Sequence, residues 1–163
     1  MERKSGIYQQ QSNKLELKLR SLDNQREQIM GYQDLLRSVA QKITGNIEPE
    51  KAAELKNIYN QMSALVKEDI EGMRQYAEVV REMNNLSLPT PPSKIDFSYT
   101  NDNGERVFDE IAYDKAMSQY DIEKSLYDVS VAQLNAQIKD LSDKHSAIYE
   151  DIQKLKAQAD EIN

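Results

Sequence analysis

Apolar side chains recur every seven residues along the last third of the chain. One row is Tyr113, Tyr120, Tyr127, Leu134, Leu141, Ile148, Leu155 and Ile162. A second row, four residues behind the first, includes Met117, Val131, Ile138 and Ile152. Alternating spacings of four and three are typical of a helix that pairs with other helices in a coiled coil. The pattern predicts a helix over 109–162 with Asp109 as its N-cap.

Two earlier segments predict two further helices. Residues 5–44 carry a weaker seven-residue row, and residues 49–87 carry three apolar positions per heptad, enough to contact two neighbours. Gly45 and Pro49 mark the end of the first helix and the start of the second. Since the connection is short, these two helices should be antiparallel. The predicted fold is all-α: an elongated antiparallel three-helix coiled-coil bundle, with residues 1–163 as a single domain.

Residues 88–108 interrupt this helical pattern with a Pro-rich linker and a predicted β-hairpin. Three prolines end the second helix, and the following "KIDFSYT" alternates apolar and polar residues. Asn103-Gly104 indicates a tight turn in which both residues have positive φ. A lone two-stranded ribbon is marginal in water. We therefore expect Ile95, Phe97 and Tyr99 to form a contact surface.

The third predicted helix is longer than its two neighbours. If the shorter helices end first, residues 144–163 overhang them. Ile148, Ile152 and Leu155 would then be exposed, as a second surface that requires a partner.

Composition and charge narrow the classes of partner. Residues 1–47 carry eight Lys or Arg against five Asp or Glu, whereas residues 88–163 carry eight against fifteen, so these segments should lie together. No basic face with interleaved aromatic residues is present, which disfavours nucleic acid. No apolar run is long enough to span a membrane, and no cleavable signal is visible. We expect a cytoplasmic protein, or one exported or incorporated into a particle without such a signal.

Candidate chemistry is sparse in this sequence. The chain has no cysteine and a single histidine, His145. His145 lies in the second heptad row of the third predicted helix, four residues after Leu141. Without a visible partner, His145 is interpreted as a residue that sets helix register. Asp69 interrupts an apolar row of the second helix, and Lys124 is one cation that could reach it. The sequence predicts no catalytic residue, no cofactor and no metal, and hence a protein that is not an enzyme.

Two resemblances bear on function. The run over 108–155, "FDEIAYDKAMSQYDIEKSLYDVSVAQLNAQIKDLSDKHSAIYEDIQKL", resembles the C-terminal helix of hydrophilic tip and filament proteins of type III secretion systems. That resemblance implies a component of a secretion apparatus. Two long helices joined through a hairpin also resemble prefoldin subunits, which implies a chaperone. Prefoldin subunits have no counterpart of the helix at 5–44.

These observations predict a structural protein that works by contact. We expect coiled-coil self-association or partner binding in a larger complex, such as a secretion apparatus or a phage particle, with the chain as a homo-oligomer or as one component. The alternative is a prefoldin-like chaperone or an adaptor that holds client proteins.

Overall fold

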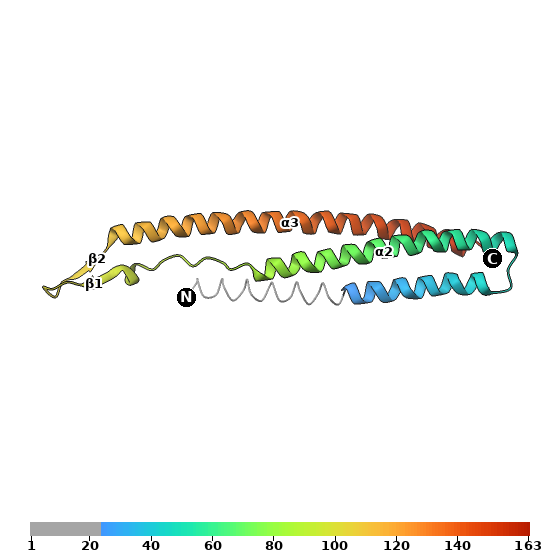
Figure 1. Ribbon diagram of the computed structural model, residues 1–163, viewed down its shortest axis with the longest axis horizontal. Coiled ribbons are helices and arrows are strands. Elements are labelled where there is room, and N and C mark those ends of the chain that lie inside the picture. The colour runs from blue at the N-terminus through green and yellow to red at the C-terminus, as the bar shows by residue number, and fades with distance from the viewer. Residues whose placement is uncertain (1–23) are drawn as a thin grey trace. The chain divides into compact units, whose positions relative to one another are not determined.

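A computed structural model of the chain describes residues 24–163. The chain is mostly helical, with three helices and a small antiparallel hairpin between the second and the third, which confirms this part of the prediction. The first helix is described over 24–44, and its predicted start at residue 5 lies outside the described residues. Helix α2 is Pro49–Asn85 and helix α3 is Glu110–Asp160 (Figure 1).

The chain separates into two compact units. The first comprises Met1–Asn84 and Ala136–Asn163, and the second is Asn85–Asn135. Helix α3 is continuous and contributes residues to both units. The sequence predicts a single domain over 1–163, and that prediction stays untested.

Neighbouring helices of the first unit run in alternate directions. The amide of Gln25 donates to the carbonyl of Met73 at 2.6 Å, so the start of the helix at 24–44 lies beside the later part of α2. Lys51 Nζ donates to the carbonyl of Asn163 at 2.9 Å, so the start of α2 lies beside the end of α3. Both pairs of neighbours are therefore antiparallel.

The last turn of the first helix also contacts the end of α3, through Lys42. The amide of Gly45 donates to the carbonyl of Lys42, and α2 begins at Pro49, as the sequence predicts. Lys42 Nζ donates to the carbonyls of Ala159 at 2.9 Å and Ile162 at 3.1 Å. The amide of Ile162 also donates to the carbonyl of Ala159, at 3.2 Å. A cation at this end of α3 complements the negative end of the helix dipole.

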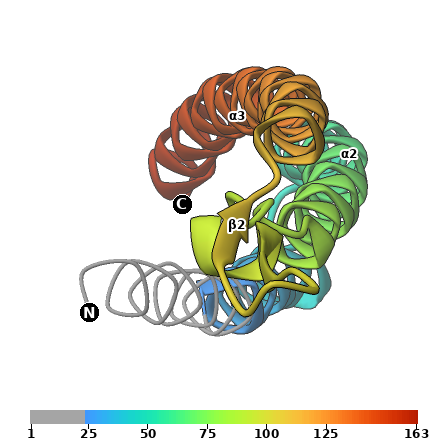
Figure 2. The ribbon, with the colours of Figure 1, turned by 90° about the vertical axis from the view of Figure 1, so that its left-hand side faces the viewer.

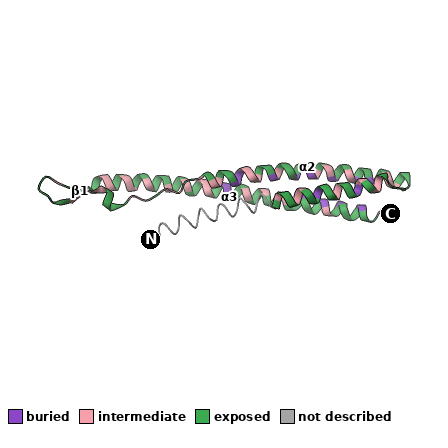
Figure 3. Cartoon of the chain, turned by 90° about the horizontal axis from the view of Figure 1, so that it is seen from below, coloured by how far each residue is buried: buried purple, intermediate pink, exposed green. Residues whose placement is uncertain are grey.

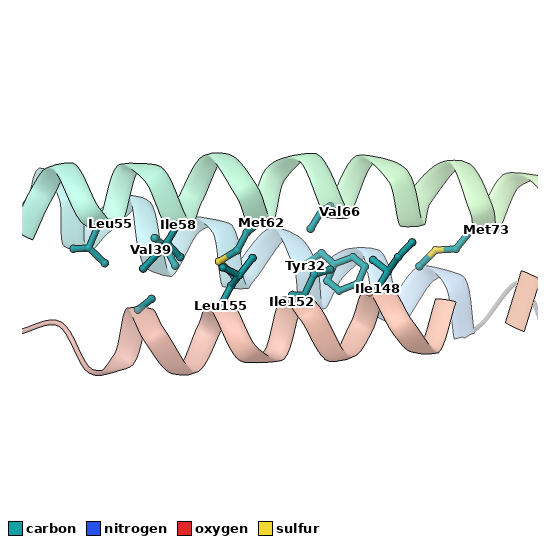
Figure 4. Packing of buried hydrophobic residues seen from close by; sticks show 11 residues of the cluster. Tyr32, Val39, Leu55, Ile58, Met62, Val66, Met73, Ile148, Ile152 and Leu155 are labelled. Carbon is teal, nitrogen blue, oxygen red and sulfur yellow. The ribbon is translucent and has the colours of Figure 1, made fainter. Parts of the chain in front are cut away.

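A single hydrophobic cluster joins all three helices of this unit (Figure 4). Its buried members are Tyr32, Val39, Leu55, Ile58, Met62, Val66, Met73, Ile148, Ile152, Leu155 and Ala159. Leu55, Met62 and Ile152 have 0% of their surface exposed. Burial of this apolar surface is the main force that holds the helices together.

The predicted overhang at the end of α3 is wrong. Ile148, Ile152 and Leu155 are only 7%, 0% and 8% exposed, and they belong to the core. The reason is helix register, because the end of α3 lies beside the turn between the other two helices, where both cover it. The extra length of α3 is its first half, residues 110–135, in the second unit.

The hairpin of the second unit is shorter than predicted. Strand β1 is Ser98–Thr100 and strand β2 is Arg106–Phe108, paired antiparallel, and β2 leads into α3 (Figure 2). Lys94–Phe97 forms a 3-10 turn, in which the amide of Asp96 donates to the carbonyl of Ser93. Ile95 and Phe97 therefore precede the strand, and their alternation with polar residues does not reflect strand pairing.

The turn of the hairpin also differs from the predicted type. Gly104 has φ of 77°, but no other residue described by the structure has positive φ. The side-chain oxygen of Asn101 accepts from the amides of Asn103 and Glu105, at 3.0 and 2.9 Å. The carbonyl of Asn101 accepts from the amide of Gly104 at 3.0 Å. These contacts form a three-residue loop that closes through Gly104, in place of a two-residue turn.

Aromatic contacts fix the hairpin on the first turn of α3. The rings of Phe97 and Phe108 lie 5.7 and 5.4 Å from the ring of Tyr113, measured between centroids. Phe97 is thereby half-buried, whereas Ile95 and Tyr99 are 71% and 53% exposed. Of the three predicted contact residues, Ile95 and Tyr99 are the ones available at the surface.

Candidate functional site

A buried carboxylate lies where the three helices of the first unit meet. Asp69, on α2, is 1% exposed. The hydroxyl of Tyr32, from the first helix, donates to its Oδ2 at 2.5 Å. From α3, Nδ1 of His145 lies 2.8 and 3.0 Å from the two carboxylate oxygens. Because a buried carboxylate without partners is strongly destabilising, these contacts are what allow Asp69 to occupy this position.

The carboxylate determines the tautomer of His145. An ionised carboxylate can only accept hydrogen bonds, so the imidazole proton lies on Nδ1. In the neutral ring Nε2 is then an acceptor, and it points away from Asp69. The side chain of His145 is 37% exposed, so a ligand from solvent can reach this nitrogen.

The partner of Asp69 was not predictable from local pattern. The expected pairing with Lys124 is wrong, because Lys124 Nζ lies 2.5 Å from Asp128, one turn along the same helix. His145 is 76 residues away from Asp69 in the chain. Both residues interrupt otherwise apolar rows, and this shared interruption was the signal that could have paired them.

The Asp69–His145 pair orients an imidazole as in hydrolytic triads. Within residues 24–163, no serine or threonine hydroxyl forms a hydrogen bond with His145. Over the same residues, no group of three His, Cys, Asp or Glu side chains could hold a metal ion. The arrangement therefore supplies an oriented hydrogen-bonding group on α3.

Tyr32 should make stability fall at alkaline pH. Burial, and then the carboxylate of Asp69, raise the pKa of Tyr32 well above its ordinary value of 10.0. Above pH 10.0 the unfolded chain loses this proton and the folded chain retains it, so folding loses up to about 1.4 kcal/mol per pH unit. Urea unfolding between about pH 8 and about pH 11 should show a steeper fall for the wild type than for Tyr32→Phe.

The exposed residue Tyr99 provides the control for this measurement. Tyr99→Phe should leave the alkaline slope of the wild type unchanged, because Tyr99 is 53% exposed and lies in the hairpin. Equal slopes for the wild type and Tyr32→Phe would contradict the role given to the buried hydroxyl.

A second feature is an exposed apolar row on the first half of α3. Ile111, Ile122, Leu126 and Val129 are 74%, 56%, 64% and 54% exposed. At about 100° per residue they fall within an arc of about 60° on one face of the helix. We name these four residues the α3 stripe. The opposite face carries Tyr113 and Tyr120 of the predicted heptad row, which are half-buried. Figure 3 shows both exposed and intermediate residues along this end of α3.

Acidic residues border the α3 stripe on both sides. Asp114, Asp121 and Asp128 follow one edge at seven-residue spacing, and all three are exposed. Glu123 lies beside the other edge, and the exposed Lys115 lies within the arc of the stripe itself. The stripe therefore has acidic residues along both edges and one cation on the same face.

The part of the chain described by the structure contains no helix with the length and apolarity needed to cross a membrane. No family model, curated protein or solved structure matches the chain. The resemblances to type III secretion proteins and to prefoldin subunits stay predictions from the sequence.

Proposed function

We propose that the protein is a non-enzymatic building block that self-associates through the α3 stripe within a larger protein assembly. A secretion apparatus or a phage particle is the kind of assembly that suits such a chain. In this proposal the three helices form an elongated antiparallel coiled-coil bundle, and the α3 stripe adds a second seam to its longest helix. The exposed stripe itself is the observation that carries the proposal.

Burial of the stripe would stabilise an assembly substantially. Each of its four side chains gains roughly 1.5–3 kcal/mol when it is fully removed from water. Single exposed apolar residues are common on protein surfaces, but several of them gathered on one helical face indicate a contact surface. The gain must exceed the entropy lost on association, and four aligned residues on each copy are sufficient for micromolar binding.

The hairpin supports a second candidate function. Ile95 precedes strand β1 and Tyr99 lies within it, and both are exposed, which is compatible with a prefoldin-like chaperone or adaptor that holds client proteins. A chain that stays monomeric and suppresses the aggregation of an unfolded client would favour this candidate over self-association.

A double variant of the stripe tests the proposed function. Ile122→Gln with Leu126→Gln keeps strong helix formers but removes the apolar groups. Because each lost side chain is worth more than the 1.4 kcal/mol of a tenfold change, the Kd of self-association should rise at least tenfold. Sedimentation equilibrium at several concentrations measures this Kd.

Ile95→Gln is the matched control, because it removes an isoleucine outside α3 that is 71% exposed, more than either residue of the double variant. It should leave the Kd unchanged. An equal loss from Ile95→Gln, or no loss from the double variant, would contradict association through the stripe.

A further inference from the structure

A groove of about 630 Å³ opens among the three helices of the first unit. Gly31 on the first helix and Gly72 on α2 both line it. A Cβ atom built on either glycine would meet no heavy atom within 4 Å. The groove thus has open space at the two positions where its walls lack side chains.

These two glycines are not required by packing. A glycine inside a helix is about 1 kcal/mol less favourable than alanine. Neither Gly31 nor Gly72 has positive φ, and neither is in close contact with a neighbour that would exclude a methyl group. Their effect on the molecule is the open space that they leave along the groove.

One wall of the groove carries an oriented acceptor beside an aromatic ring. His145 donates from Nδ1 to Asp69, which leaves Nε2 as the acceptor. The ring of Tyr149 lies 6.3 Å from the imidazole, tilted by 36°, and Tyr149 is 43% exposed. A ligand here can donate a hydrogen bond to Nε2 and place an apolar face against Tyr149.

The rest of the lining mixes polar side chains with apolar ones such as Leu35, Met73 and Leu141, and it is almost neutral. It carries amide and hydroxyl groups, which can both donate and accept hydrogen bonds. Two charged residues of opposite sign also line it, which favours neither an anion nor a cation. The residues in question are Gln28, Gln153, Ser142 and Ser146, with Glu27 and Lys156 as the charged pair.

We propose that this groove binds a saccharide. Sugar hydroxyls donate and accept as the lining does, and one of them donates to Nε2 of His145. The apolar C–H face of a pyranose ring stacks on Tyr149, and the space at Gly31 and Gly72 receives the remainder of the sugar. The volume lies in the range of sites for small organic ligands. This site lies in the first unit and is independent of the α3 stripe.

Nuclear magnetic resonance of the intact chain tests the proposal, with glucose, N-acetylglucosamine and maltose as probes. His145 is the only histidine, so its imidazole signals need no assignment. At least one probe should shift these signals and receive magnetisation from the protein in a saturation-transfer experiment. Absence of both effects for all three sugars up to about 50 mM, well above a millimolar Kd, overturns the proposal.

Two variants localise the binding while preserving the fold. His145→Asn keeps an N–H near the position of Nδ1 for Asp69 but removes the Nε2 acceptor. Gly72→Leu fills the groove with a good helix former. Each should reduce saturation transfer at least tenfold with an unchanged circular dichroism spectrum. Lys67→Leu adds the same side chain at an exposed position of α2 outside the groove and should have no effect. Full binding by Gly72→Leu overturns the proposal.

Discussion

Ile152→Ala is expected to lower the free energy of unfolding by about 2–5 kcal/mol. Ile152 lies in the core between all three helices of the first unit and has 0% of its surface exposed. Truncation removes buried methyl groups and leaves a cavity that rigid neighbouring helices can only partly close. The effect should be among the largest that a single substitution produces in this chain.

Ile122 on the same helix provides the matched control, because it is 56% exposed. Ile122→Ala should change the free energy of unfolding by less than about 0.5 kcal/mol in dilute solution, where no second copy covers it. Urea unfolding monitored by circular dichroism measures both variants. Similar small effects at both positions would mean that the end of α3 is not buried, and would restore the overhang expected from the sequence.

Asp69→Ala is expected to produce the second large loss of stability. It leaves the hydroxyl of Tyr32 and the N–H of His145 without their acceptor. Each unsatisfied donor costs roughly 1–3 kcal/mol where water cannot replace the lost partner. Because Tyr32 is 3% exposed and His145 is partly exposed, most of the loss should come from the tyrosine side. The loss is measured as the shift of the urea unfolding curve.

Glu68, next to Asp69 in the chain, is the control, because it takes part in an ordinary exposed ion pair. Glu68 pairs with Lys144 at 3.7 Å, and both side chains are about half exposed. Glu68→Ala should therefore cost only about 0–1 kcal/mol. A loss for Asp69→Ala no greater than that for Glu68→Ala would show that the buried contacts contribute little.

The heptad rows and the helix-end signals predict the helices closely. The second helix was expected over 49–87 and is Pro49–Asn85, and the third was expected over 109–162 and is Glu110–Asp160. Asp109 caps α3 as predicted, since its carboxylate accepts from the amide of Ala112 at 3.1 Å. These features depend on residues close together in the chain, and local sequence therefore determines them.

Helix register could not be predicted in the same way. A seven-residue repeat looks the same after a shift of one heptad, so apolar rows alone do not say which part of α3 faces which part of α2. One register is marked by the Asp69–His145 contact and by the hydrogen bonds from Lys42 and Lys51 to carbonyls at the end of α3. These contacts join distant residues, which is why Ile148, Ile152 and Leu155 were misplaced.

The α3 stripe was also not predicted from the sequence, for a different reason. Counting in sevens selected the row of Tyr113 and Tyr120 and passed over residues on the opposite face. Ile122 and Val129 are seven residues apart, but this row is interrupted at Lys115, and Ile111 returns to the same face only through a spacing of eleven. In the hairpin, the side chain of Asn101 determined the turn, and a preference at Asn103-Gly104 alone could not reveal it.

Disulfide cross-linking at Ser118 tests self-association through the α3 stripe most directly. Ser118 is exposed and lies on the same face, near the midpoint of the stripe, and the natural chain has no cysteine. If the proposal is correct, Ser118→Cys places two thiols together, and mild oxidation should give a covalent dimer roughly tenfold faster than Lys67→Cys on α2. Equal, slow cross-linking of both variants at all concentrations would contradict the proposal.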